Sequence, residues 1–195
     1  MKKHVLIGAV LACLPGAAFA QGEEESPSLA SAFAGPRIEA RIGYETPTVS
    51  GDGDVYKIGS AVSYGGEIGF DLAAGNRVVL GPYATFEFSN VELCDGGDCL
   101  EIDNNLGVGL RAGVTVSPTA LVYAKAGYAR IKISATSGEF SDSETDSGIQ
   151  GALGIEANFG PMMYGRLEAN YGDYGGFYGV NLQRRHVAAA VGLRF

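Results

Sequence analysis

Charged, polar or very small side chains occupy every second position along several stretches of this 195-residue sequence. Apolar residues lie between them, so each stretch has one apolar face and one face of charged, polar and very small residues if it forms an extended strand. Acids and bases are nearly balanced on the charged face, and an unpaired charge in a narrow interior is strongly unfavourable. The pattern therefore predicts an internal network of ion pairs that comprises Glu39, Arg41, Glu67, Asp71, Glu87, Arg111, Lys125, Glu156, Arg166, Glu168 and Arg194.

Side chains suited to nucleophilic catalysis are few. His186 belongs to the last strand-like stretch, and Ser141, Ser143 and Ser147 stand in a separate polar segment. A serine nucleophile needs its base within hydrogen-bond reach, and no His-x-Ser spacing is present. We expect His186 to be a structural histidine and the protein not to be an enzyme.

Metal and redox chemistry depend on the cysteines and on the acidic stretches "GDGD" (51–54) and "DSETD" (142–146). Neither acidic stretch has the full spacing of a calcium loop, and Cys94 and Cys99 lack the further ligands that a zinc site requires. We predict no metal and no cofactor. In an oxidising compartment, Cys94 and Cys99 are expected to form a disulfide that closes a Gly-containing hairpin.

The amino-terminal segment has the composition of a signal peptide: two lysines, an apolar run and then Ala-Phe-Ala. We expect residues 1–20 to be removed by cleavage between Ala20 and Gln21, although Cys13 leaves a lipoprotein signal as an alternative. Residues 21–35 are expected to form a flexible periplasmic arm, and residues 36–195 the folded domain. The formal net charge of −8 makes nucleic acid a poor partner, because its binding needs Lys and Arg.

Eight stretches alternate with a period of two, which is the period of a half-buried strand. They are residues 38–44, 63–72, 78–88, 105–116, 121–129, 148–159, 164–172 and 186–195. Short links (73–76, 117–119, 160–162) alternate along the chain with long polar links (46–61, 89–104, 134–147, 173–182), as in outer-membrane barrels. The prediction is an all-β fold: an eight-stranded antiparallel up-and-down transmembrane β-barrel with both termini periplasmic.

A soluble lipocalin-like carrier would also have eight alternating strands, but its apolar face would line a cavity. Glycine decides between the two arrangements, because the polar face is crowded with it. A narrow lumen needs such small residues, whereas a solvated surface does not. The positions are Gly43, Gly65, Gly69, Gly107, Gly109, Gly113, Gly127, Gly154, Gly172 and Gly192.

Three segments, "LVYAKAGYARIKI" (121–133), "YGRLEANYGDYG" (164–175) and "AAAVGLRF" (188–195), resemble the small outer-membrane β-barrel family of Gram-negative bacteria. That family includes the OmpA membrane domain, OmpX, the opacity-type barrels and the alphaproteobacterial "porin family" surface antigens. The resemblance implies a location in the outer membrane, with membrane lipid and lipopolysaccharide as neighbours. It also implies that Val191, Leu193 and Phe195 form the signal that the barrel-assembly machinery reads.

The expected function is structural or interactive: support of the envelope and presentation of the long loops to host or other surfaces, including adhesion. A small porin that passes ions or very small solutes is the main alternative, and a barrel enzyme that modifies lipid A is a less favoured one. Eight strands leave little open lumen, so a pore would require the internal charges to change partners.

Overall fold

The computed structural model describes residues 28–51, 54–57, 59–95, 98–137, 140–177 and 180–195. The expected signal peptide, its cleavage site and residues 21–27 of the expected arm lie outside this part of the chain. The described elements are a 3-10 helix and nine strands: η1 (Leu29–Phe33), β1 (Gly35–Gly51), β2 (Asp54–Lys57), β3 (Ala61–Ala73), β4 (Val78–Asp95), β5 (Asp98–Ser117), β6 (Ala120–Ser137), β7 (Phe140–Asn158), β8 (Met163–Phe177) and β9 (Val180–Arg194).

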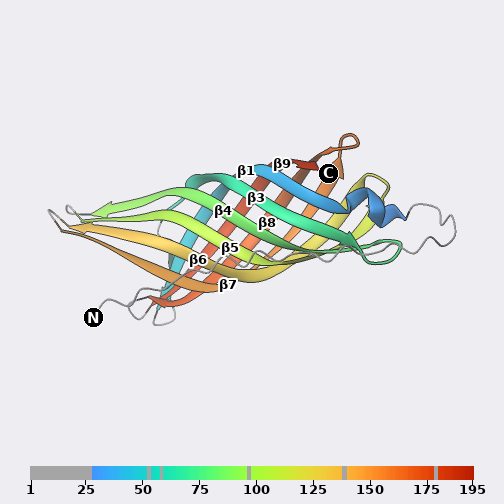
Figure 1. Cartoon of the computed structure of the whole chain (residues 1–195). Helices are drawn as coiled ribbons and strands as arrows, with labels where there is room; N and C mark the ends of the chain where they lie inside the picture. Colours follow the sequence, from blue (N-terminus) through green and yellow to red (C-terminus); the bar gives the residue numbers. More distant parts are fainter. Residues whose placement is uncertain (1–27, 52–53, 58, 96–97, 138–139, 178–179) are drawn as a thin grey trace, which may run out of the picture.

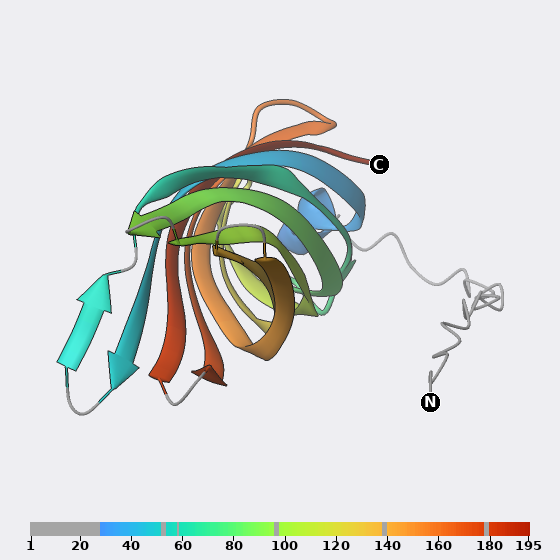
Figure 2. The ribbon, with the colours of Figure 1, turned by 90° about the vertical axis from the view of Figure 1, so that its left-hand side faces the viewer.

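Eight of these strands close into a barrel (Figures 1 and 2). Strands β3 to β9 pair antiparallel in chain order, β1 pairs with β3, and β1 also pairs with β9 from Arg37 opposite Arg194 to Ser50 opposite Asn181. The closure leaves no free edge in this zone, as a hydrocarbon environment requires. The predicted eight-stranded antiparallel barrel is confirmed. Strand β2 is an additional short strand that pairs only with β1, outside the closed wall.

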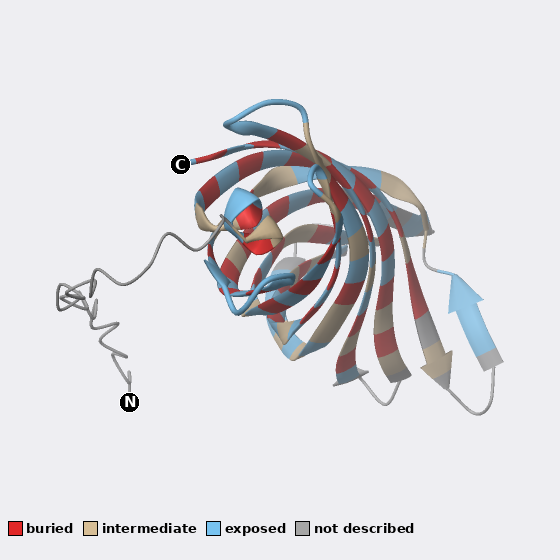
Figure 3. Ribbon diagram, turned by 90° about the vertical axis from the view of Figure 1, so that its right-hand side faces the viewer, coloured by how far each residue is buried: buried red, intermediate tan, exposed pale blue. Residues whose placement is uncertain are grey.

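The outer wall is apolar and the interior is polar, which confirms the predicted orientation of the two faces. On β5, Leu110 is 68% exposed and its neighbour Arg111 is 1% exposed. The same alternation produces the buried and exposed bands along every barrel strand in Figure 3. The apolar outer band covers residues 78–88 of β4, and residues 187–194 of β9 together with Phe195, which matches the roughly 9–11 residues of a membrane-crossing strand.

Outward aromatic residues lie near both limits of this band, as the girdles of membrane barrels do. Toward the long hairpins they are Tyr44, Tyr64, Phe88, Tyr128 and Tyr171, all at least 44% exposed. Toward the short turns they are Phe70, Phe159 and Phe195. We call these two ends of the barrel the hairpin end and the turn end.

Most of the predicted long loops are strand, so this part of the sequence prediction is wrong. β4 continues to Asp95 and β5 begins at Asp98. In the same way, β6 continues to Ser137 and β7 begins at Phe140. The period of two continues beyond the apolar outer band, but in the opposite phase. On β6, Ile131 and Ile133 are buried inside, and Arg130 and Lys132 point outward. Outward polar side chains are stable in water and unfavourable in lipid. These extensions are therefore the parts of the strands that project beyond the membrane.

Beyond the membrane band the barrel separates into two sheets (Figure 1). The strands form one sheet in the wall, but beyond the apolar outer band β4 to β7 stay paired on one side, and β2, β1, β9 and β8 stay paired on the other. Pairing between β7 and β8 begins only at Ile149 opposite Asp173, and pairing between β3 and β4 ends at Ser63 opposite Ser89. A buried apolar cluster lies at the base of the separation: Val91, Ile102, Ala129, Ile131, Ile133, Tyr174 and Leu182.

The expectation of a flexible arm through residue 35 is wrong for residues 28–35. Helix η1 lies against the turn end of the barrel, where Phe33 is fully buried with Val79, Leu121 and Tyr123. The Ala30 amide donates to the carbonyl of Asn76 at 3.0 Å, which ties the helix to the β3–β4 turn. Burial of the Phe33 ring explains why residues 28–35 are held against the barrel, because it removes a large apolar area from water.

The interior glycines make room for large side chains. At each of the ten predicted lumen positions, a Cβ atom would lie 3.0 Å or less from another heavy atom. A Cβ on Gly154 would overlap the ring of Tyr123, and one on Gly192 would overlap the ring of Tyr164. The small residues predicted for a narrow lumen therefore accommodate side chains of neighbouring strands at most of these positions, and the backbone of β4 at Gly65.

Substitution of Gly154 tests this packing. Gly154→Val should lower the free energy of unfolding in detergent by about 1–3 kcal/mol, the usual cost of overpacking, and should reduce the fraction of heat-modifiable folded protein on gels. Gly151→Val is the matched control, because it lies on the same strand and its Cβ would meet its nearest neighbour at 3.5 Å. Equal unfolding midpoints for the two variants would contradict a tightly packed lumen.

Candidate functional site

The lumen contains a continuous network of ion pairs among buried side chains. All eleven residues predicted from the sequence lie in it, together with Arg37, Glu45 and Arg184. The network has seven acids and seven bases, so it carries no net charge among the described residues. Its acids are Glu39, Glu45, Glu67, Asp71, Glu87, Glu156 and Glu168, and its bases are Arg37, Arg41, Arg111, Lys125, Arg166, Arg184 and Arg194.

Glu67 is the centre of the network. Its carboxylate forms ion pairs with Arg37 at 2.6 Å, Arg41 at 3.0 Å, Lys125 at 2.5 Å and Arg166 at 2.7 Å. β3 places it there from one side of the barrel, while β1, β6 and β8 supply the cations. Four bases around one carboxylate would repel one another if further acids were not close by.

Glu168 and Glu39 supply that compensation. Glu168 accepts from Lys125 at 2.6 Å and from Arg41 at 2.9 Å, and the hydroxyl of Tyr123 donates to it at 2.9 Å. Glu39 pairs with Arg166 at 2.5 Å. Each cation is thus shared between carboxylates from different strands, which ties opposite walls of the barrel together.

Toward the turn end, the network continues through two further acids. Arg111 bridges Asp71 at 3.0 Å and Glu156 at 2.6 Å, and Arg194 pairs with the same two acids at 3.3 and 2.7 Å. The Arg111 guanidinium also lies 4.1 Å from the ring centroid of Tyr123, within cation–π range. Arg194 follows Leu193 in the closing strand, so this branch joins the carboxy-terminal strand to the rest of the wall.

Toward the hairpin end, Glu87 and Glu45 complete the network. Glu87 pairs with Arg41 at 3.0 Å and with Arg184 at 2.9 Å, and Arg184 also contacts Glu45. The Ser89 hydroxyl donates to Glu45 as well. Beyond this point the interior becomes apolar.

Arg37, Glu45 and Arg184 were not in the predicted network, although two of them follow its pattern. Arg37 and Glu45 have the same parity as Glu39 and Arg41 on β1, so continued alternation was the signal that could have identified them. Arg184 precedes the predicted start of the last strand at residue 186. Its two-residue spacing from His186 is informative only once β9 is known to begin at Val180.

Both ends of the lumen are closed by apolar side chains. Phe33, Val79 and Leu121 fill the turn end, and the cluster that includes Ile131 and Leu182 fills the hairpin end. The internal cavity found between the charged layers has a volume of about 10 Å³ and is lined by Arg41, Tyr83, Thr85, Glu87, Lys125, Gln150, Gly151, Ala152, Glu168, Asn170 and Arg184. That volume holds roughly one water molecule. Buried side chains of the charged layers and of the two apolar ends thus occupy the described part of the lumen.

His186 lies in the lumen wall rather than in a catalytic arrangement. Its Nε2 lies 3.0 Å from the hydroxyl of Ser63 and 3.7 Å from Glu87, so both neighbours are on the same ring nitrogen. A catalytic triad places the nucleophile and the acid on opposite ring nitrogens. Ser141, Ser143 and Ser147 lie on β7, which pairs with β6 and β8, whereas His186 lies on β9.

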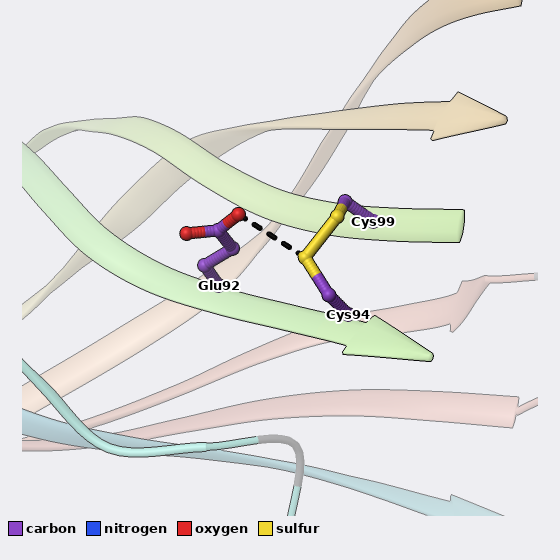
Figure 4. A group of neighbouring side chains, drawn as sticks. All are labelled: Glu92, Cys94 and Cys99. Atoms are coloured by element: carbon purple, nitrogen blue, oxygen red, sulfur yellow. Dashed lines mark hydrogen bonds between the residues drawn. A yellow bond between two sulfur atoms is a disulfide. The ribbon is translucent and has the colours of Figure 1, made fainter. Parts of the chain in front are cut away.

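Cys94 and Cys99 face each other across the β4–β5 hairpin and form a disulfide, with Cα atoms 4.1 Å apart (Figure 4). Glu92 lies beside them, and its Oε1 is 3.1 Å from Sγ of Cys94. The three side chains come close enough to suggest a metal site by distance. Sulfur atoms bonded to each other are not thiolate ligands, so the arrangement does not provide one.

A closed antiparallel barrel with an apolar outer band, aromatic residues at its limits and a charge-paired interior defines a transmembrane β-barrel protein. Among the described residues, no helix has the length and hydropathy needed to cross a membrane. The model of the family described as "Outer membrane protein beta-barrel domain" matches residues 6–195. The chain belongs to this family, and its location is the outer membrane of a Gram-negative bacterium.

Solved structures show the same fold at low sequence identity. The attachment invasion locus protein Ail of Yersinia pestis is 15% identical, with a TM-score of 0.52, over 82% of this chain and 99% of Ail. Neisserial surface protein A is 13% identical, with a TM-score of 0.58, over 81% of this chain and 97% of that protein. No match is found among curated protein sequences.

Removal of the central carboxylate should be strongly destabilising. Glu67→Gln leaves four buried bases short of one acid, so we expect a loss of about 3–5 kcal/mol in the free energy of unfolding. Denaturant titration in detergent measures this loss. Circular dichroism is the signal, because the chain contains no tryptophan for fluorescence. Glu67→Gln/Lys125→Gln should recover part of the loss, because the two residues are in direct contact.

The control is Asp103→Asn, which breaks the partly exposed pair with Lys132 at 3.1 Å. Such a pair contributes about 0–1 kcal/mol. An unfolding curve for Glu67→Gln that overlaps the curve for Asp103→Asn would show that the lumen network does not stabilise the barrel.

Proposed function

We propose that this protein is a closed, non-conducting outer-membrane barrel that presents its hairpins at the cell surface. Its function is to contact surfaces or ligands with these hairpins and to support the envelope. Both termini lie in the periplasm in this proposal. The observation that supports it most directly is a lumen filled by paired charges and closed at both ends, combined with long water-facing strands at only one end.

The orientation follows from the sizes of the two ends. Short periplasmic turns and longer extracellular connections are the usual arrangement in outer-membrane barrels. Here the turn end has the brief connections around Gly75, Thr119 and Pro161, whereas the hairpin end has strands that continue well past the aromatic residues. A polar outward face on these extensions is compatible with an aqueous environment outside the membrane.

The charge of the hairpins limits the class of ligand. Exposed acids on the extended strands include Glu92, Glu101, Asp142 and Glu144. The structure of Ail has been determined with the heparin analogue sucrose octasulfate, which is a polyanion. An acidic surface repels polyanions, so we propose a neutral or cationic ligand for this chain.

The remaining proposed partners contact the wall. Outer-membrane lipid and lipopolysaccharide cover the apolar outer band, and the barrel-assembly machinery reads Val191, Leu193 and Phe195 during insertion. Val191 and Leu193 share the outward face of β9 and Phe195 directly follows the strand; the three residues are 56%, 40% and 64% exposed. That exposure makes them accessible to an assembly factor before lipid covers them.

Cysteine labelling on intact cells tests the orientation. In a Cys94→Ser/Cys99→Ser background, Glu144→Cys should react with a membrane-impermeant maleimide, because β7 extends beyond the hairpin-end aromatics. Arg77→Cys, in the exposed β3–β4 turn, should react only after the outer membrane is opened. The reverse pattern would place the hairpins in the periplasm and would refute surface presentation.

Planar-bilayer recording tests whether the lumen is closed. The purified wild-type barrel should give no defined conductance steps, since its internal cavity of about 10 Å³ is too small for a hydrated path. Protein-free detergent and the Asp103→Asn variant are the controls. Reproducible wild-type steps that Glu87→Gln or Arg111→Gln alters would contradict the closed barrel and favour a small pore.

A further inference from the structure

The hairpin end contains a long strand edge that no described strand covers. β7 pairs with β6 along its whole length, from Ser137 opposite Phe140 to Ala120 opposite Ala157. On its other side, pairing with β8 begins only at Ile149 opposite Asp173. The backbone of β8 at Asp173 and Tyr174 still lies beside Gly148. Residues 140–147 therefore have alternate backbone N–H and C=O groups directed away from β6 with no partner strand among the described residues.

The geometry of β8 explains why this edge is open. The register between β8 and β9 shifts between Asp173 and Gly176, as in a β-bulge. Gly175 has a φ of 75°, a left-handed conformation that favours glycine. Bulges bend a strand and increase its twist, so β8 turns away with β9 at the point where β7 continues straight with β6 (Figure 1).

The open segment of β7 has acids on one face and hydroxyls on the other. Residues opposite each other in an antiparallel pair point to the same side. Glu144 lies opposite Ile133 and Asp146 lies opposite Ile131, so both acids share the concave inner face of the sheet. By alternation Asp142 joins them, while Ser143, Thr145 and Ser147 face outward.

Asp146 supplies a second, independent observation. Its Oδ2 atom is buried and has no hydrogen-bond partner in the described part of the chain. A buried acceptor without a donor is unfavourable. A cationic group placed beside this edge would satisfy it, and Glu144 and Asp142 are exposed at successive positions along the same line.

Pairing with a second copy at this edge is disfavoured. Antiparallel association of two β7 edges would place acids of both copies on the same face, where like charges opposite each other are destabilising. Acids on an edge strand also discourage non-specific aggregation. An extended segment with basic residues at every second position has the opposite charge and the same spacing.

We propose that the open edge of β7 binds a basic, extended segment of a partner polypeptide as an added strand. Backbone groups of residues 140–147 hydrogen-bond to the segment. Its Lys or Arg side chains pair with Asp142, Glu144 and Asp146, and its alternate side chains, small or β-branched, lie beside Ser143 and Thr145. This inference rests on the proposed surface role of the hairpins and specifies the class of partner.

The test uses the full barrel in lipid nanodiscs and a fluorescein-labelled peptide of four Lys-Thr repeats with blocked ends. Fluorescence anisotropy should show saturable binding that weakens as salt is added. A Glu-Thr peptide of equal length should not bind. Two N-methylated forms of the Lys-Thr peptide, one methylated at each lysine and one at each threonine, should differ: one loses binding and the other retains it, because only one set of amides faces β7.

Matched variants locate the site. Asp142→Asn/Glu144→Gln should weaken binding about fivefold to tenfold, the effect of losing two cross-strand charge pairs. Glu92→Gln/Glu101→Gln removes two exposed acids that face each other on β4 and β5 of the same sheet. This control should change the affinity by less than about twofold, because salt screens exposed charges that lie away from the bound peptide.

Two results would overturn the proposal. Equal loss of affinity in both double variants, with no difference between the N-methylated peptides, would show non-specific attraction to an acidic surface. A stable dimer in nanodiscs that excludes the peptide would show that a second copy occupies the edge. Nanodiscs expose both ends of the barrel, so this result is independent of the cell-labelling result on orientation.

Discussion

Pairing of charges inside a closed wall is the interaction on which the rest of this structure depends. A lumen of eight strands is too narrow to hydrate its side chains freely, and an unpaired charge there would be strongly unfavourable. The chain meets this condition by placing seven acids and seven bases at alternating positions on several strands. Because most cations contact carboxylates from two or three strands, the wall cannot distort locally without separating charges.

The network also accounts for the distribution of glycine and tyrosine. Arg111, Tyr123 and Tyr164 are large, and each lies where the neighbouring strand offers a glycine or a shared carboxylate. Large polar side chains and small residues thus fill the lumen together, as close packing requires. Phe33 closes one end of this column, and the apolar cluster around Ile131 closes the other. The charges therefore lie between two layers of apolar side chains, where screening by water and salt is weak.

The fold and most of the network could be predicted from the sequence, because each depends on a period of two that is visible in the residues themselves. What could not be predicted depends on the environment of the strand. Residues 131 and 133 continue the period of β6, but the apolar side changes from the outer face to the inner face where lipid gives way to water. Residues 131 and 133 therefore lie outside both the predicted strand (121–129) and the predicted polar link (134–147). Phe33 was missed for a related reason: a single aromatic among alanines and serines has no period, and only the turn end of the barrel gives it a place to be buried.

This change of phase connects the membrane barrel to its proposed function. Within the band, lipid requires every backbone group to be paired, so the wall must close. Beyond the band, water can satisfy free backbone groups, and the constraint disappears. The bulge in β8 and the left-handed Gly175 occur at this boundary, where separation of the two sheets first becomes tolerable. An open strand edge beside Asp142, Glu144 and Asp146 is thus a feature that only the aqueous part of the barrel could retain, and it lies on the side where a partner could reach it.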